Sequence, residues 1–287
     1  MTHQRIAVTG GSGRLGRFVV AELGRDRAVM VLDRAPPQDD AAFAPVDIMD
    51  LPGLKRALKG HDAVVHLAGI DLDFAVADDE TMRVNAMGSW HVLQAAEELG
   101  IGRVILCSSV CASGVNEARA DFPPLHLPVD EDHPCRPTTA YGLSKLVLET
   151  MGAGFARRGM AVLSLRPTLV MFEDIVASVI ARAADPAPRS LFYYVTPEDA
   201  ARGFRCALDA EDVRDGAFFL TAGDSCRAEP TLDWLPGMIG AMPAIKDAAR
   251  FADNPRASVF SGQRARRLLG FAPKSNWLEI AARHRGS

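Results

Sequence analysis

The sequence lacks the features that would tie it to a membrane, a nucleic acid or an oxidising compartment. Its formal net charge is −4 and its pI is near 6.0, so no basic excess would attract nucleic acid or an acidic lipid surface. No apolar run is long enough to span a bilayer, and we expect no signal peptide because the sequence leads directly into the first predicted strand. The five cysteines include no CxxC pair, and no His or Cys cluster completes a zinc site. We therefore expect a cytoplasmic protein with free thiols, without a metal and without a nucleic-acid or membrane partner.

The first motif that is present is a glycine-rich turn within residues 6–16, which read IAVTGGSGRLG. A short apolar run ends at Thr9, the turn carries Gly10 and Gly13, and Gly16 falls in the segment that follows. This order predicts a strand, a tight turn and a helix. The unpaired N–H groups and the dipole at a helix start attract an anion, and glycine lets a pyrophosphate approach the backbone. The motif therefore predicts a dinucleotide-binding site.

Apolar runs continue to alternate with helical segments up to residue 167. The further predicted strands are 28–32, 44–46, 62–67, 103–107 and 161–165, and the predicted helices are 51–58, 81–99 and 139–158. Strands that are apolar throughout and alternate with helices predict a doubly wound parallel sheet, the α/β Rossmann arrangement. Beyond this point the pattern is less regular, with helices predicted at 174–184, 197–208, 231–239 and 263–269 and a strand at 218–220. We therefore predict one integrated domain, with a Rossmann core over residues 1–167 and a small C-terminal capping lobe over residues 168–287.

An acidic residue at the end of the second predicted strand bears on the choice of cofactor. Asp33 can accept hydrogen bonds from a ribose diol and repels a 2′-phosphate, which favours NAD. Arg14 and Arg34 could instead pair with a 2′-phosphate, which leaves NADP as the less favoured alternative. Asp47, at the end of the third predicted strand, could bond the adenine amino group or be a plain turn residue.

The reactive residues are a tyrosine and a lysine four positions apart, Tyr141 and Lys145, at the start of a long predicted helix. They share one helix face, and a nearby ammonium should lower the pKa of the tyrosine so that it can act as an acid or base. Ser109 follows the strand over 103–107, where its hydroxyl can bond a substrate oxygen. Tyrosine and lysine at this spacing arise by chance on many helices. We predict a reactive site here because Ser109, Asp33 and the glycine turn are expected at the same edge of the sheet.

With these residues the chain resembles the extended short-chain dehydrogenase/reductase family, also called the NAD-dependent epimerase/dehydratase family. The matching positions are residues 9–16 (TGGSGRLG), Asp33, Asp47 and Ile48, residues 66–69 (HLAG), Asn85, Gly88, Ser108 and Ser109, residues 141–145, and Arg166 with Pro167. The resemblance implies that Tyr141 exchanges a proton with the substrate, that Lys145 bonds the nicotinamide ribose, and that Ser109 orients the substrate oxygen. The cofactor-binding residues that we expect are Gly10, Gly13, Arg14, Leu15, Gly16, Asp33, Arg34, Asp47, Ile48, Leu67, Ala68, Gly69, Asn85, Tyr141 and Lys145.

Within this family the chain is most similar to short members of the uronate-dehydrogenase type. The substrate-contacting residues that we expect are Asp71, Ser109, Val110, Cys111, Tyr141, Leu169 and Arg189. Arg189 stands ten residues before Asp199, the spacing at which those enzymes clamp a sugar carboxylate. Val110, Cys111 and Leu169, however, stand where those enzymes carry polar residues, and each lost hydrogen bond costs about 1 kcal/mol. We therefore expect a less polar alcohol or ketone, or a different hydroxy acid, rather than a hexuronate.

Three functions stay open. The first is an NAD-dependent oxidoreductase that acts on a small hydroxyl or carbonyl substrate. The second is an NAD-dependent nucleotide-sugar epimerase or dehydratase, which the short lobe and the absence of acidic residues beside Ser109 disfavour. The third is a non-catalytic NAD(P)-sensing regulator, which retention of Tyr141 and Lys145 disfavours. In this family the two long helices commonly form a homodimer, and we expect one here.

A few other residues are expected to have structural roles. We expect His66 to pack at the end of a strand, and His126 and His133, in a proline-rich loop, to face solvent. Residues 192–194, which read FYY, are expected either to line the substrate entrance or to form a strand.

Overall fold

A seven-stranded parallel sheet organises the protein. The computed structural model describes residues 4–72, 75–117, 119, 121–185 and 190–286. The strands are β1 (Arg5–Thr9), β2 (Ala28–Asp33), β3 (Phe43–Pro45), β4 (Ala63–His66), β5 (Arg103–Cys107), β7 (Ala161–Pro167) and β8 (Asp215–Leu220), in the order β3-β2-β1-β4-β5-β7-β8. All neighbouring pairs are parallel. The order reverses between β1 and β4, and in such sheets ligands bind outside the carboxyl ends of the strands at this point.

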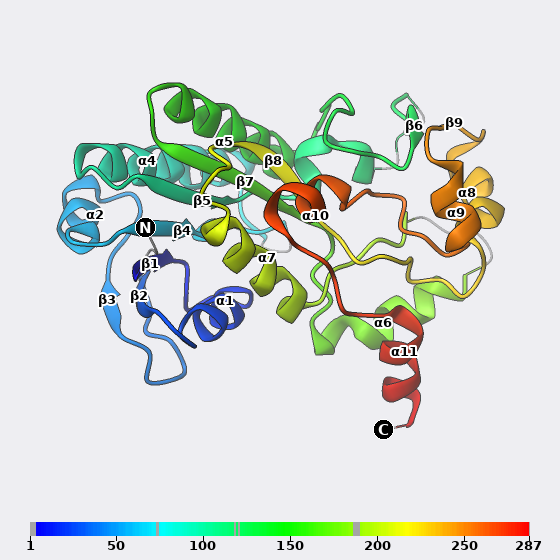
Figure 1. Ribbon diagram of the computed structural model, residues 1–287, viewed down its shortest axis with the longest axis horizontal. Helices are drawn as coiled ribbons and strands as arrows, with labels where there is room; N and C mark the ends of the chain where they lie inside the picture. The colour runs from blue at the N-terminus through cyan, green and yellow to red at the C-terminus, as the bar shows by residue number, and fades with distance from the viewer. Residues whose placement is uncertain (1–3, 73–74, 118, 120, 186–189, 287) are drawn as a thin grey trace.

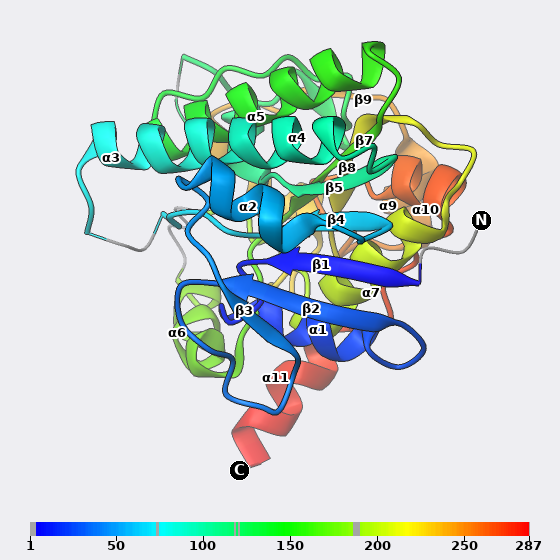
Figure 2. The ribbon, with the colours of Figure 1, turned by 90° about the vertical axis from the view of Figure 1, so that its left-hand side faces the viewer.

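Helices cover both faces of the sheet, as Figure 2 shows. On one face lie α2 (Leu51–Leu58), α4 (Gly88–Glu98) and α5 (Ala140–Arg157), and on the other lie α1 (Gly16–Leu23), α7 (Pro197–Asp209) and α10 (Gln263–Leu269). The central strands are buried along their whole length, since both their faces meet helices. The doubly wound α/β fold predicted from the apolar runs is confirmed.

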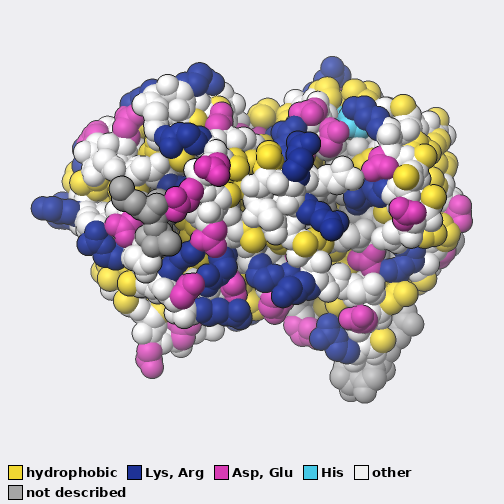
Figure 3. All heavy atoms as spheres, viewed as in Figure 1, with side chains coloured by type: hydrophobic (Ala, Val, Ile, Leu, Met, Phe, Trp, Pro, Cys, Tyr) yellow, Lys and Arg dark blue, Asp and Glu magenta, His cyan; other side chains and the backbone are white. Residues whose placement is uncertain are grey.

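The remaining elements form the lobe at the right of Figure 1. They are β6 (His126–Leu127), α6 (Glu173–Ala183), α8 (Thr231–Ile239), β9 (Ala244–Ile245), α9 (Ala248–Asp253) and α11 (Trp277–Gly286). β6 and β9 pair in parallel, so the loop before α5 belongs to the lobe while β8, α7 and α10 belong to the sheet and its cover. The surface is indented between the two parts (Figure 3). The division of the chain at residue 167 stays a prediction.

One of the long helices is interrupted by a π-helical turn. The segment predicted as a continuous helix over 81–99 consists of α3 (Asp78–Met82), a π-helical turn (Arg83–Met87) and α4. Such turns add a residue to the helix and are frequent at functional sites. Asn85 lies within this turn, which fits its expected place near the cofactor.

The prediction that His126 and His133 face solvent is wrong, because both side chains are buried. His133 Nε2 accepts a hydrogen bond from the Leu125 N–H at 3.0 Å, while Nδ1 lies 2.9 Å from the Pro134 carbonyl oxygen. The second bond requires a proton on Nδ1, so the ring is neutral and both nitrogens are satisfied. The polarity of the loop suggested that it is exposed. His133 can be buried because backbone groups satisfy both of its ring nitrogens. The strand expected as one alternative over 192–194 is also absent.

Within the described ranges, no helix is long and apolar enough to cross a membrane. The same residues include no group of three or more His, Cys, Asp or Glu side chains that could hold a metal ion.

Candidate active site

The glycine turn after β1 packs tightly against its surroundings. Gly10 has φ of 72°, and a Cβ there would lie 2.4 Å from the backbone nitrogen of Ala68. A Cβ on Gly16 would lie 2.2 Å from the Gly10 carbonyl oxygen. These two glycines are therefore needed for the turn to close on the end of β4 and the start of α1.

Gly13 lies on the side of the same turn that faces a pocket. A Cβ on Gly13 would meet only the Gly10 carbonyl oxygen, at 3.2 Å, and Gly13 lines a pocket of about 290 Å³ with Ser12 and Arg14. A bare backbone directly before the N-cap of α1 fits a pyrophosphate, whose charge the helix start attracts. The residues present thus fit the phosphates of a dinucleotide. Leu15 occupies the helix N-cap position directly before Gly16.

Asp33 lies beside the glycine turn, as predicted. Its Oδ2 accepts the Ser12 N–H at 3.1 Å and its Oδ1 accepts the Arg34 N–H at 2.7 Å. Each carboxylate oxygen retains accepting capacity for a ribose hydroxyl. Arg14 points elsewhere: its guanidinium pairs with Asp174 at 2.5 Å and stacks on the Phe172 ring, 4.2 Å from the ring centre. Arg14 thus connects the turn to α6.

The residues expected at the adenine and ribose lie at the ends of β3 and β4. Asp47 follows β3 and its Oδ1 accepts the Met49 N–H at 2.9 Å; it lines a pocket of about 570 Å³ together with Arg34. Ile48 is buried beneath it. Leu67, Ala68 and Gly69 follow β4 directly, which places their backbone at the carboxyl edge of the sheet.

Asn85 holds this segment after β4 in place. Its Oδ1 accepts the Ile70 N–H at 2.7 Å, and its Nδ2 donates to the Ile70 carbonyl at 2.9 Å and to Ser144 Oγ at 3.1 Å. A Cβ on Gly69 would lie 2.9 Å from the Asn85 oxygen. Asn85 therefore clamps residues 69–70 to α5, next to the reactive tyrosine and lysine.

Ser109, Tyr141 and Lys145 converge as the sequence predicted. Ser109 caps a short 3₁₀ turn after β5, where its Oγ accepts the Cys111 N–H at 3.2 Å. Lys145 is buried, with its Nζ 2.9 Å from the Cys107 carbonyl oxygen and 5.4 Å from the centre of the Tyr141 ring. A Cβ on Gly69 would lie 3.9 Å from the same Nζ, so Lys145 stands between the segment after β4 and Tyr141.

The expected lowering of the Tyr141 pKa is wrong for the protein alone. Burial raises the pKa of Tyr141 well above its ordinary value, and the charge of Asp71 raises it further, whereas interaction with the Ser109 hydroxyl lowers it. Sequence reasoning counted only the attraction of the ammonium and omitted the desolvation of the phenolate. The free protein thus holds Tyr141 as a neutral phenol.

His66 is a packing residue, as expected. Its Nδ1 lies 2.7 Å from Thr9 Oγ1 and its Nε2 lies 2.9 Å from Ser89 Oγ, which connects β1, β4 and α4. Burial, followed by the charge of Lys145, lowers the pKa of His66 to about 3, so the ring is neutral at physiological pH.

The side of the site opposite the cofactor residues is apolar. Val110 and Cys111 are buried in the core of the lobe, and the half-buried Tyr141, Leu169 and Tyr193 pack against the same cluster. Burial raises the pKa of Cys111 to about 11, so it is a neutral thiol. Asp71 is exposed.

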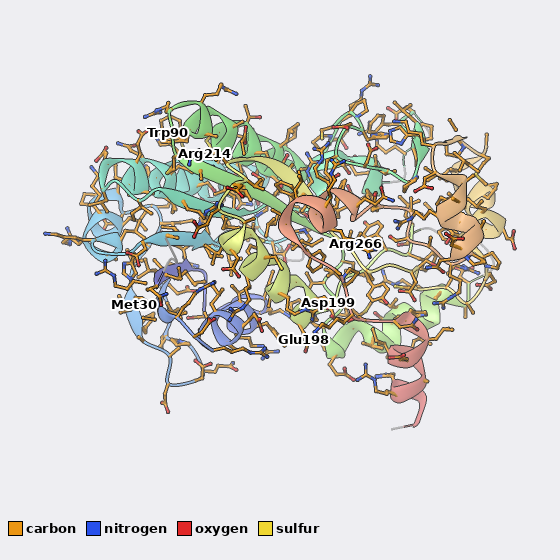
Figure 4. The ribbon with its side chains drawn as sticks, viewed as in Figure 1. Met30, Trp90, Glu198, Asp199, Arg214 and Arg266 are labelled. Carbon is orange, nitrogen blue, oxygen red and sulfur yellow. The ribbon has the colours of Figure 1, made fainter. Side chains whose placement is uncertain are left out.

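The predicted carboxylate clamp depends on Arg189, and Asp199 only marked its position in the sequence. Arg189 lies outside the described residues. Asp199 is buried at the start of α7, where its oxygens accept the Lys274 N–H at 3.1 Å and the Ser275 N–H at 3.0 Å. It therefore anchors the segment between α10 and α11, beside which it lies in Figure 4.

Sequence reasoning missed a buried ionic network behind Ser109. The Glu149 carboxylate pairs with Arg166 at 2.6 Å and accepts a hydrogen bond from Ser108, and Arg166 also contacts Cys135 Sγ at 3.3 Å. The network ties the ends of β5 and β7 to α5 and so fixes the backbone that carries Ser109. The sequence contained one indication of this network. Glu149 follows Lys145 by four residues, which places it on the same face of the predicted helix.

Fold and site together define a Rossmann-type enzyme that works with a nicotinamide dinucleotide. A model of the NAD dependent epimerase/dehydratase family matches residues 6–217. The chain therefore belongs to this family, the extended short-chain dehydrogenases/reductases, and is an NAD-dependent enzyme.

Relatives in the family include sugar dehydrogenases. The chain is 31% identical to L-arabinose 1-dehydrogenase (NAD(P)(+)) of Haloferax volcanii over 213 residues, which cover 72% of this chain and 83% of that protein. It is 30% identical to uronate dehydrogenase of Pseudomonas putida over 168 residues, which cover 56% of this chain and 59% of that protein. Among solved structures, UDP-glucose 4-epimerase from Brucella ovis in complex with NAD superposes with a TM-score of 0.74 at 24% identity, over 99% of this chain and 98% of that one. This last likeness shows the fold.

Proposed function

We propose that the chain is an NAD-dependent dehydrogenase that oxidises a small, neutral alcohol to a carbonyl compound, or runs the reverse reduction. The observation that carries the proposal is the convergence of Ser109, Tyr141 and Lys145 at the sheet edge, with Lys145 between Tyr141 and the segment held by Asn85. Relatives that act as sugar dehydrogenases support it.

In the oxidation, Tyr141 first loses its own proton to solvent, and the resulting phenolate takes the substrate's hydroxyl proton as the carbon–hydrogen bond releases a hydride. NAD held by the glycine turn and Asp33 would supply the acceptor for that hydride. The Ser109 hydroxyl holds the substrate oxygen beside the phenol and stabilises the charge that develops on it. The Lys145 ammonium favours the phenolate form of Tyr141 once the site is occupied.

Charge and polarity around Tyr141 favour a neutral substrate over an acid. The carboxylate of Asp71 already raises the Tyr141 pKa, so a substrate carboxylate placed nearby would be repelled. Val110, Cys111 and Leu169 offer an apolar wall. A hexuronate, with a charge and several hydroxyl groups, fits this side poorly.

The test is to monitor NADH formation with a panel of aldoses, hydroxy acids, and alicyclic and aromatic alcohols. Replacing Tyr141 with Phe should lower kcat by about 10²–10⁴-fold, since general acid–base catalysis contributes that much. Tyr194→Phe serves as the matched control, because the Tyr194 hydroxyl bonds Asp224 in the lobe at 2.7 Å. Undiminished turnover in Tyr141→Phe would contradict the assignment.

Nucleotide-sugar epimerisation is the second candidate, because one relative at 30% identity over 197 residues is the UDP-glucose 4-epimerase of Azospirillum brasilense. Such an enzyme would retain NAD through purification and interconvert UDP-sugars without net NADH. Detection of both properties would replace the dehydrogenase assignment.

We also propose a homodimer formed through α4 and α5, in a cytoplasmic location. Trp90, on the outer side of α4 in Figure 4, rests its ring 5.3 Å from that of Phe155 on α5 and remains 38% exposed. Leu143 and Val147 of α5 are likewise exposed. These side chains extend an apolar face across two neighbouring helices. Light scattering should give the mass of a dimer for wild type and of a monomer for Val147→Glu.

All five cysteines are free thiols, which supports the proposed location in a reducing compartment.

A further inference from the structure

A series of buried polar side chains runs through the interior from the end of β1 to the helix that carries Tyr141. Its members come from β1, β4, the π-helical turn, α4 and α5, and α4 and α5 lie side by side on one face of the sheet (Figure 2). In order along the series they are Thr9, His66, Ser89, Asn85 and Ser144, each at most 2% exposed. Buried polar groups are costly unless they are bonded, so the bonds among these residues constrain the elements that carry them.

The first half of this buried polar series is bonded in one direction only. Ser89 Oγ lies 2.5 Å from the Asn85 carbonyl oxygen, which can only accept, so the Ser89 proton is used there. Ser89 Oγ then accepts from His66 Nε2, 2.9 Å away, which places the proton of the neutral ring on Nε2. His66 Nδ1 in turn accepts the Thr9 hydroxyl at 2.7 Å. These bonds anchor the main chain of Asn85 to β4 and β1.

The second half of the series runs from the Asn85 side chain to Tyr141. Asn85 Nδ2 donates to Ser144 Oγ at 3.1 Å, and Ser144 Oγ donates to the Tyr141 carbonyl oxygen at 2.7 Å. The same Asn85 side chain accepts the Ile70 N–H at 2.7 Å and donates to the Ile70 carbonyl at 2.9 Å. Ser144 thus bonds Asn85 to the main chain of Tyr141, and Asn85 bonds Ser144 to the segment after β4.

Helix formation alone does not account for Ser144. A serine within a helix that bonds a carbonyl of the preceding turn weakly disfavours the helix. Thr150 makes the same kind of bond on the exposed side of α5, to the Leu146 carbonyl at 2.9 Å. Ser144 differs from Thr150 because it is fully buried and also accepts a bond from another element, at Asn85. Its bond therefore fixes the first turn of α5 against a neighbouring part of the site.

We propose that Ser144 is a positioning residue for the reaction, which holds the main chain of Tyr141 against the segment after β4 through its bond to Asn85. The inference rests on the proposed function, since it concerns where the Tyr141 hydroxyl stands relative to the reacting carbon. Ser144 is fully buried and acts through the Tyr141 main chain rather than by touching the substrate. A displacement of a reacting group by about 1 Å can cost on the order of a hundredfold in rate.

The experiment compares wild type and Ser144→Ala in single turnovers of an alcohol that the panel identifies as a substrate, so that product release does not mask the chemical step. The rate of NADH formation should fall about ten- to a hundredfold, with the Kd values of NAD and of the alcohol each within about twofold. A rate within about twofold of wild type would overturn the proposal, and a fall in Tm at an unchanged rate would assign Ser144 a structural role.

Two control variants separate positioning from loss of stability. Thr150→Ala removes a hydroxyl that bonds a carbonyl on the same helix, and Tyr194→Phe removes a buried hydrogen bond in the lobe, to Asp224. Both should keep the single-turnover rate within about twofold of wild type, because neither contacts the buried polar series. An equal loss of rate in Tyr194→Phe and Ser144→Ala would overturn the proposal, since any lost buried bond would then have the same effect.

A double-mutant cycle with Asn85→Ala tests the route from Ser144 to the segment after β4. If Ser144 acts through its bond to Asn85, adding Ser144→Ala to Asn85→Ala should slow NADH formation by less than about twofold further. Additive losses would contradict this route and overturn the proposal.

Hydrogen–deuterium exchange separates this inference from the proposed function. Asn85 accepts the Ile70 N–H, so Ser144→Ala should speed exchange at this amide more than Thr150→Ala does. If wild type oxidised no alcohol, the proposed function would fail. Faster exchange would then still support the role of Ser144 in holding Asn85 and Tyr141 together, whereas unchanged exchange would overturn it as well.

Discussion

Replacing Glu149 with Gln tests how the site is supported from behind. The Glu149 and Arg166 side chains are 10% and 4% exposed, and the carboxylate is the acidic partner of a guanidinium that is otherwise surrounded by Cys135 and the Phe219 ring. The amide keeps the shape of the side chain and removes its charge. Breaking a buried pair from one side costs about 3–5 kcal/mol, because the remaining charge is left uncompensated.

Urea denaturation of Glu149→Gln should therefore show a free energy of unfolding lower by about 3 kcal/mol, with an unchanged m-value. The exposed pair between Arg83 and Glu80 provides the control, since Glu80→Gln should leave the free energy of unfolding almost unchanged. The network also fixes the backbone before Ser109, so kcat of the folded variant should fall while NAD affinity is retained. A loss under 1 kcal/mol with normal kcat would refute the reasoning that this network supports the site.

Two other predictions concern the cofactor turn and the buried histidine. Gly10→Ala should abolish NAD binding in a fluorescence titration, because its Cβ would lie 2.4 Å from the Ala68 nitrogen; Gly100→Ala, with the same φ of 72° but no atom within 4 Å, should retain affinity and lose only about 1 kcal/mol of stability. Because the folded pKa of His66, about 3, lies below its ordinary value, the unfolded chain binds the proton first as pH falls below about 6.5. The free energy of unfolding should therefore fall by up to about 1.4 kcal/mol per pH unit between about pH 6.5 and about pH 3 because of this group. Denaturant titrations at several pH values would measure this dependence. A weaker dependence on pH in His66→Asn would confirm the prediction, and an unchanged one would contradict it.

Much of the Rossmann core could be predicted because its signals are local. The strand that ends at Asp33 and the helix that begins near Tyr141 are marked by runs of apolar residues and by turn residues beside them. The prediction for 44–46 was displaced by one residue from β3, since a three-residue edge strand has little periodicity to fix its bounds. Convergence of Ser109, Tyr141 and Lys145 followed from topology, because the carboxyl ends of parallel strands meet at one edge.

What escaped prediction depends on contacts between distant residues. His133 can be buried because backbone groups bond its ring, and the pKa of Tyr141 is raised by the residues that bury it. Neither set of neighbours can be identified from the sequence. α9 and α11 are short lobe helices whose positions depend on packing; Asp224, for example, accepts the Trp277 N–H at 3.0 Å. The role of Asp199 was likewise not predictable, because its carboxylate binds a segment more than seventy residues away along the chain.

The π-helical turn at Arg83–Met87 has a consequence for sequence change in this region. Because each helical residue turns the chain by about 100°, deleting one residue there would restore an ordinary helix and rotate α3 by that angle relative to α4. Asn85 would then lose its register with Ile70 and Ser144 while every apolar contact of α4 stayed in place. A change that looks harmless by composition would disconnect the cofactor segment from the helix that carries Tyr141. The length of this stretch is therefore constrained as strictly as the identity of Asn85.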